Sequence, residues 1–168
     1  MKRVKKQGNA PAERRDNHSG KDTAGCLAVP VPLERFPGIP MEYVEVLRSK
    51  GIGDTESFIE ATLTNHESTM LASSTGIPAG RIMEIRALCD LARIRGMGAA
   101  TARVLYHAGI RSAGQLAEAD PALLYKELKT YPGAYKDVIL PLRENDLRES
   151  IRCAGIIVQR ERRQREQV

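Results

Sequence analysis

The sequence contains no Trp and only two Phe among its 168 residues, so aliphatic side chains and Ala must fill any core that it builds. That composition favours packed helices, because Ala and Leu are strong helix formers. No apolar run approaches the roughly 20 residues that cross a bilayer, so we expect no membrane partner. The length fits one ordinary domain with tails and excludes a large enzyme that carries its own cofactor domain.

Cysteine and histidine are also scarce. The three cysteines, Cys26, Cys89 and Cys153, are an odd number at wide spacing. This spacing argues against a disulfide framework and predicts a reducing, cytoplasmic location. The three histidines lie far apart with no cysteine at ligand spacing, so we expect no metal site. The sequence shows no nucleophile–base pair and no phosphate loop with Lys, so we expect no enzyme and no cofactor.

The basic excess lies at the two ends of the chain. Residues 1–24 hold seven basic and three acidic residues, and residues 159–168 hold four and two, whereas the rest holds fifteen and sixteen. We expect residues 1–35 to form a disordered, basic and Pro-rich arm, and residues 159–168 a charged helical tail. The arm is either a solubilising segment or a non-specific arm for polyanions.

An internal repeat organises the middle of the chain. Residues 46–61 and 104–119 align without a gap at an offset of 58, with six of sixteen positions identical. Each copy predicts a helix, a stop glycine, an apolar plug and a polar cap that begins the next helix. These features are Gly51, Ile52 and Asp54 in the first copy and Gly109, Ile110 and Ser112 in the second. Ser112 with Gln115 also fits a capping box.

The segment between the two copies predicts a helix with apolar side chains on two sides. At 100° per residue, residues 81–94 carry two apolar stripes separated by polar positions, so both sides of this helix should be buried. We therefore expect an all-α domain over 36–158, in which repeat one (36–80) and repeat two (81–158) share a central helix.

The most informative stretch is residues 91–105, where an apolar helix runs into Gly96-Met97-Gly98 and then into a second helix. This pattern resembles the helix-hairpin-helix motif of DNA-binding and repair proteins. With its flanks, the chain resembles a small uncharacterised family of tandem helix-hairpin-helix domains over roughly residues 36–158. The resemblance implies that the N-terminal end of the second helix grips a nucleic-acid phosphate.

The residues of this hairpin suit such a role. Glycine permits the positive φ that a tight turn needs, and Met97 is expected to insert between the two helices. The first amides of the second helix form an anion site, since they lack intrahelical acceptors and lie at the positive end of the helix dipole. Residues 81–111 also hold six arginines against two acids. The candidate nucleic-acid-binding residues are Arg93, Arg95, Gly96, Met97, Gly98, Ala99, Ala100 and Arg103.

The first hairpin lacks these features. Pro40 replaces the second glycine, and Glu42 and Glu45 place negative charge in the following helix, where it would repel a phosphate. We expect repeat one to be architectural and repeat two to bind DNA or another nucleic acid without sequence preference. Three alternatives stay open: a purely structural hairpin, a protein-interaction scaffold with no nucleic-acid contact, and an accessory domain of a nuclease or polymerase partner.

Overall fold

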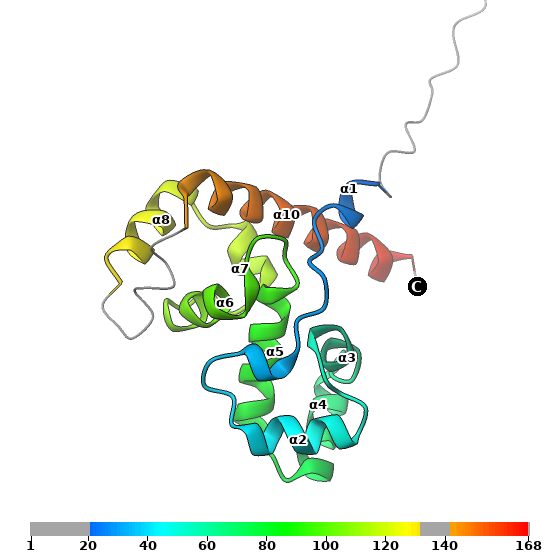
Figure 1. Cartoon of the computed structure of the whole chain (residues 1–168). Helices are drawn as coiled ribbons and strands as arrows, with labels where there is room; N and C mark the ends of the chain where they lie inside the picture. Colours follow the sequence, from blue (N-terminus) through cyan, green and yellow to red (C-terminus); the bar gives the residue numbers. More distant parts are fainter. Residues whose placement is uncertain (1–20, 132–141, 168) are drawn as a thin grey trace, which may run out of the picture.

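A computed structural model describes residues 21–131 and 142–167 of the chain. These residues form an all-α protein, as the sequence predicts, with two isolated β-bridges and no strand within the described part. Figure 1 shows the helices in chain order. The elements are α1 (Lys21–Ala24), the 3-10 helix η1 (Leu33–Arg35), α2 (Met41–Ser49), α3 (Thr55–Glu60), α4 (Asn65–Thr75), α5 (Ala79–Ala92), α6 (Gly98–His107), α7 (Ala113–Ala117), α8 (Pro121–Lys129) and α10 (Glu144–Glu166).

Helix α5 is the centre of the fold. It packs against α3 and α4 on one side and against α6 and α7 on the other, and α10 lies across α7 and α8. One predicted stripe is buried along its whole length. The second is buried only near the end of the helix, where Leu91 and Ile94 are fully enclosed, whereas Met83 remains exposed. The predicted two-sided burial is therefore correct for the second half of the helix and wrong for the first.

Both copies of the repeat stop their first helix with the same backbone geometry. Gly51 and Gly109 have positive φ angles of 80° and 94°. The amide after each glycine donates to the carbonyl of the third-last residue of the helix, Leu47 at 3.0 Å and Leu105 at 2.9 Å. This is the Schellman arrangement, in which a left-handed residue satisfies otherwise unpaired helix carbonyls.

The caps that follow are also present in both copies. The Asp54 side chain accepts from the amide of Ser57 at the start of α3, and the Ser112 side chain accepts from the amide of Gln115 at the start of α7. The capping box predicted for Ser112 is half formed. The Gln115 side-chain oxygen accepts instead from the Arg111 amide, one residue before the cap.

The N-terminal region differs from the predicted arm. Residues 1–20 lie outside the described part of the chain, but residues 21–35 are folded. After α1, the strap (residues 25–32) runs past the second hairpin, where the Ala28 amide donates to the Arg93 carbonyl at 2.8 Å. Cys26 and Leu33 are buried in the common core. These apolar side chains hold the segment against the domain, so the domain begins earlier than residue 36.

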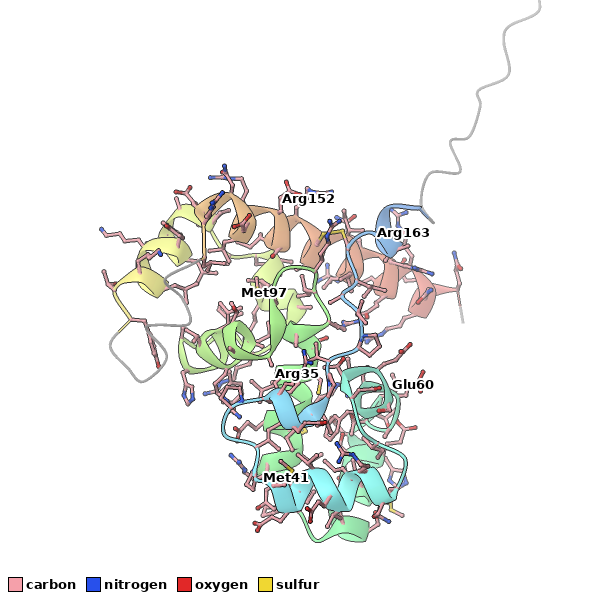
Figure 2. All side chains as sticks on the ribbon, viewed as in Figure 1. Arg35, Met41, Glu60, Met97, Arg152 and Arg163 are labelled. Carbon is pink, nitrogen blue, oxygen red and sulfur yellow. A yellow bond between two sulfur atoms is a disulfide. The ribbon has the colours of Figure 1, made fainter. Side chains whose placement is uncertain are left out.

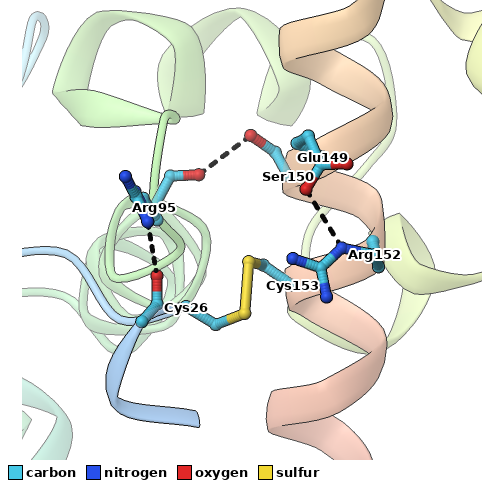
Figure 3. Close-up of a disulfide and its surroundings, with 7 residues drawn as sticks. Cys26, Arg95, Glu149, Ser150, Arg152 and Cys153 are labelled. Atoms are coloured by element: carbon cyan, nitrogen blue, oxygen red, sulfur yellow. Dashed lines mark hydrogen bonds and ion pairs between the residues drawn. A yellow bond between two sulfur atoms is a disulfide. The ribbon is translucent and has the colours of Figure 1, made fainter. Parts of the chain in front are cut away.

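The expected absence of a disulfide is wrong. Cys26 of the strap is bonded to Cys153 of α10, 127 residues away in the sequence, and Cys89 is the free, buried cysteine. Figure 3 shows the bond joining the strap to the helix. A separation this long gives no local spacing pattern, because only the folded chain brings the two residues together. The expectation of a reducing compartment, which rested on unpaired cysteines, loses that support.

Candidate nucleic-acid interface

The second hairpin joins α5 to α6 through residues 93–97, and two glycines near the start of α6 have left-handed backbone. Gly96 and Gly98 have φ angles of 89° and 65°. Met97 lies between them and is buried in the core, where the sequence places the plug. Position 96 requires glycine for two reasons. Its φ is positive, and a Cβ atom there would lie 2.8 Å from the Ser150 hydroxyl of α10. The hairpin is thus fixed by the core and by α10.

The N-terminal end of α6 carries no cap from any side chain of the described residues. Side chains cap the beginnings of α3, α4, α7 and α8, whereas α2, α5 and α10 also begin without a side-chain cap. The first turn of α6 also has no acidic residue. Gly98 is exposed and Ala99 and Ala100 are half-buried. Their amides are the first three of the helix, so they lack intrahelical acceptors and lie at its positive end.

Arg103 has a different role from the one expected. Its side chain is buried, with 3% of the residue exposed, so it cannot supply charge to a phosphate at the surface. The guanidinium is paired with Glu84 of α5, and its Nε donates to the Pro37 carbonyl of the first hairpin at 2.6 Å. Arg103 therefore joins the two halves of the domain.

Arg93 is also engaged within the fold. Its guanidinium forms ion pairs with Asp90 and with Glu161 of α10, both at 2.6 Å. Burial acts to lower the pKa of Arg93, but the bonds to Glu161 and Asp90 outweigh it and hold the pKa above its usual value. Two carboxylates thus neutralise this arginine, which fastens α10 to the end of α5.

Arg95 is the predicted arginine that stays at the surface. Its backbone is held on both sides, because its amide donates to the Cys26 carbonyl at 2.8 Å and its carbonyl accepts from the Ser150 hydroxyl at 2.9 Å. The side chain is exposed and donates to the Gly25 carbonyl at 3.1 Å, a neutral partner. Arg93, Arg95 and Arg103 are expected from the sequence to supply charge. Among the described residues, Arg95 alone of the three forms no ion pair with a carboxylate.

A cleft of about 550 Å³ opens between the hairpin and α10. Two of its side chains are cationic, Arg95 and Arg152, and two are anionic, Asp146 and Glu149. Arg152 pairs with Glu149 at 3.0 Å. The cleft is therefore close to neutral, and no local pattern in the sequence predicts it, because its two walls lie some fifty residues apart in the chain. It is lined by Arg95, Gly96, Thr101, Leu142, Asp146, Glu149, Ser150, Arg152 and Cys153.

The end of α10 carries the densest positive charge of the described residues. Figure 2 shows Arg152 near the middle of this helix and Arg163 near its end. The sequence predicts a charged helical tail here, and α10 continues through it as far as Glu166. Four arginines of the last two turns are exposed: Arg160, Arg162, Arg163 and Arg165.

Among the helices of residues 21–131 and 142–167, none combines the length and the apolar character that a membrane span requires. No three or more His, Cys, Asp or Glu side chains in that part of the chain are grouped so that they could hold a metal ion.

The comparison with protein families gives one match. Residues 37–138 match the model of a family described as a domain of unknown function, DUF4332. The chain belongs to the DUF4332 family. The matched range of this DUF4332 protein lies inside the predicted domain and includes both hairpins. No curated protein and no solved structure matches the chain.

Proposed function

We propose that this DUF4332 protein binds the phosphate backbone of DNA or another nucleic acid, without sequence preference and without catalysis. The observation that carries the proposal is the open beginning of α6. It has no side-chain cap from the described residues and no acid in its first turn, and the exposed Arg95 lies three residues before it in the chain. Such a helix end binds anions through its amides and its dipole.

The charge for this binding comes from residues other than those expected. Arg93 and Arg103 are engaged with carboxylates of the fold. In the proposal, Arg95 contacts the phosphate that the amides orient, and the four exposed arginines at the end of α10 add charge along the nucleic acid. Contacts of this kind fix the position of a protein on its ligand but do not read bases.

We also propose that the two hairpins form a tandem helix-hairpin-helix-like arrangement in which only the second binds. The equal helix stops at Gly51 and Gly109 support a repeated unit. The first hairpin is preceded by the short η1 rather than by an α-helix, and Glu42 lies in the first turn of α2. An acid at that position complements the helix dipole from within the protein and would repel a phosphate.

A protein-interaction scaffold is the second candidate, and one surface favours it. A groove of about 580 Å³ runs between α5, α6 and the loop after α3. The exposed side chains of Leu63 and Met83 line it together with Tyr106. Exposed apolar side chains in a groove are typical of surfaces that bind another protein.

The test is a binding titration of the full chain with fluorescent duplex and single-stranded DNA over a range of salt concentrations. For backbone binding, the logarithm of affinity falls with the logarithm of salt by about 0.9 per phosphate neutralised, and the dissociation constant lies around 10⁻⁴–10⁻⁶ M. The variant Arg95→Gln should bind DNA more weakly. The slope of log affinity against log salt should become smaller by roughly 0.9, the contribution of one phosphate contact.

The control is Arg35→Gln, which removes an exposed arginine beside the first hairpin. This variant should leave the slope of log affinity against log salt unchanged. Equal losses for Arg95→Gln and Arg35→Gln would show that only general charge matters and would remove the second hairpin from the proposal. No DNA binding by the full chain at about 50 mM salt, where backbone contacts are least screened, would leave the scaffold as the better function.

A further inference from the structure

The disulfide lies at the wall of the cleft between the second hairpin and α10. Cys153 is among the residues that line this cleft, whereas Cys26, on the strap, is not. The cleft volume of about 550 Å³ is in the range of small-molecule sites. Both cysteines are buried, with 4% of Cys153 and 2% of Cys26 exposed, and Cys153 is the one that borders the cleft.

The charged side chains that line the cleft with Cys153 are balanced, two cationic and two anionic. The thiolate, not the thiol, attacks a disulfide, and neighbouring arginines favour the thiolate form. Arg152 is the residue next to Cys153 and lines the cleft with it, and Figure 3 shows the Arg95 backbone bonded to Cys26 and Ser150. The acids Asp146 and Glu149 lie on the same wall, and Glu149 is paired with Arg152.

We propose that this cleft is a site of thiol–disulfide exchange, in which a small thiol reacts at Cys153 and opens or closes the link to the strap. A thiolate attacks the Cys153 Sγ, the bond between the two cysteine sulfurs breaks, and Cys26 leaves as a thiolate that takes a proton from water. A second thiolate then attacks the mixed disulfide on Cys153, which releases the small molecule as its own disulfide and leaves Cys153 reduced. The reverse reaction, with a small disulfide as oxidant, restores the bond.

The two ends of the strap differ in what else holds them. Near Cys26, backbone bonds to the hairpin remain after reduction, from the Arg95 amide to Cys26 and from the Ala28 amide to Arg93, both at 2.8 Å. Cys26 itself is buried, but Leu27 and Val29, the next large apolar side chains of the strap, are exposed. At the other end, the Leu33 amide donates to Gly53 at 3.0 Å and the Leu33 side chain is fully buried. Reduction should therefore release the Cys26 end and leave the Leu33 end in place.

The first experiment is hydrogen exchange on the full chain, oxidised and then reduced with glutathione. The amides of Ala28 and Arg95 should lose protection by about tenfold or more on reduction, because local opening no longer has to break a covalent link. The amides of Leu33 and Thr55 should stay unchanged and serve as internal controls. Equal protection in both states, or a uniform loss throughout the chain, would overturn the local release.

The second experiment tests which of the two cysteine sulfurs reacts with the small thiol. We expect Cys26→Ser, with its remaining Cys153 thiol, to form a mixed disulfide with oxidised glutathione about tenfold faster than Cys153→Ser, which retains Cys26. Arg152→Gln should slow the reduction of the native disulfide several-fold, whereas Arg148→Gln, an exposed arginine one turn earlier on α10, should not. Equal rates for the two cysteine variants, or equal effects of the two arginine variants, would contradict the cleft as the reaction site.

Cys89 provides the remaining control. It is buried, and burial raises the pKa of its thiol far above the usual range, so it should not react in the folded protein. A thiol count on the oxidised full chain should therefore find no reactive thiol before reduction and two after it. Reactive thiols at Cys26 and Cys153 in protein kept under oxidising buffer would show that the bond does not form, and the proposal would fail.

Discussion

The two hairpins of the domain begin alike and are used differently. Gly38 and Gly96 occupy equivalent positions, with φ angles of 81° and 89°. In the first hairpin, Arg81 and Arg103 from the second half of the domain donate to the carbonyls of Gly38 and Pro37. In the second, the hairpin is held by α10 and the strap, and the beginning of α6 stays open.

This difference explains why a local excess of arginine is a poor guide to a binding site. Arg81 and Arg103 share the carboxylate of Glu84, and Arg93 is paired with Asp90 and Glu161. Two of the six arginines of residues 81–111 thus hold the junction between the repeats, and a third fastens α10 to α5. The first hairpin is thus bound by arginines of the second half of the domain, and the second is the one that we propose binds a phosphate.

The largest effect is expected for removal of the arginine that holds the first hairpin. Arg103→Met leaves Glu84 with Arg81 alone and removes the donor to Pro37, so the free energy of unfolding should fall by about 3–5 kcal/mol. Arg95→Met, which shortens an exposed side chain of the second hairpin, should change it by less than about 0.5 kcal/mol. Urea unfolding measures both. Similar values would mean that Arg103 is not structural and would return it to the candidate binding residues.

Gly96→Ala should have the next largest effect. It forces a side chain onto a positive φ and brings Cβ to 2.8 Å from the Ser150 hydroxyl. We expect a loss of about 2–3 kcal/mol. Gly51→Ala, where φ is also positive but no described atom lies within 4 Å, should lose only about 1–2 kcal/mol. Ser150→Ala in the Gly96→Ala background should recover the difference, and no recovery would contradict the close packing of α10 on the hairpin.

The caps of the two repeats provide a comparison that depends on pH. Asp54→Ala and Ser112→Ala should each cost about 1 kcal/mol at neutral pH. Hydrogen bonds from Ser57 lower the pKa of Asp54 in the folded state. Its contribution is therefore complete above the unfolded pKa of about 3.9 and is lost as the pH falls through the lower, folded pKa. Thermal unfolding between neutral and strongly acidic pH should show the Asp54→Ala deficit shrinking while the Ser112→Ala deficit persists.

The smallest effect concerns the acids of the cleft. If a phosphate lies at the open end of α6, Asp146 and Glu149 repel it across the cleft. The double variant Asp146→Asn, Glu149→Gln should bind DNA two- to fivefold more tightly at low salt, an effect of about 1 kcal/mol or less. The matched control is Glu42→Gln with Glu45→Gln beside the first hairpin. An equal gain in that control would mean that net charge alone controls affinity.

Local signals in the sequence predicted the local structure well. The stop glycines, the caps and the buried Met97 depend on residues a few positions apart, and each has a backbone or packing reason. The pairing of Arg93 with Glu161, that of Arg103 with Glu84 and the bond between Cys26 and Cys153 could not be predicted, because the fold brings these partners together from 19 to 127 residues away. These distant partners decided which candidate residues remain at the surface.

The alignment of the two hairpins gives a wrong expectation at one position. Pro40 stands opposite Gly98, which suggests from sequence that Pro would be tolerated at residue 98. The backbone differs there, because φ is −61° at Pro40 and 65° at Gly98. A proline ring cannot adopt the positive angle, so Gly98→Pro would disturb the fold and is not a clean test of binding.

The most direct test of the account is an amide NMR titration of the full chain with a short DNA duplex. The central claim is that the second hairpin, and not the first, donates its helix amides to a phosphate. The account predicts that the amide resonances of Gly98, Ala99 and Ala100 shift as DNA is added, while those of Met41 and Glu42 at the start of α2 stay in place. Shifts confined to the arginines at the end of α10, with the amides of Gly98 to Ala100 unchanged, would contradict it.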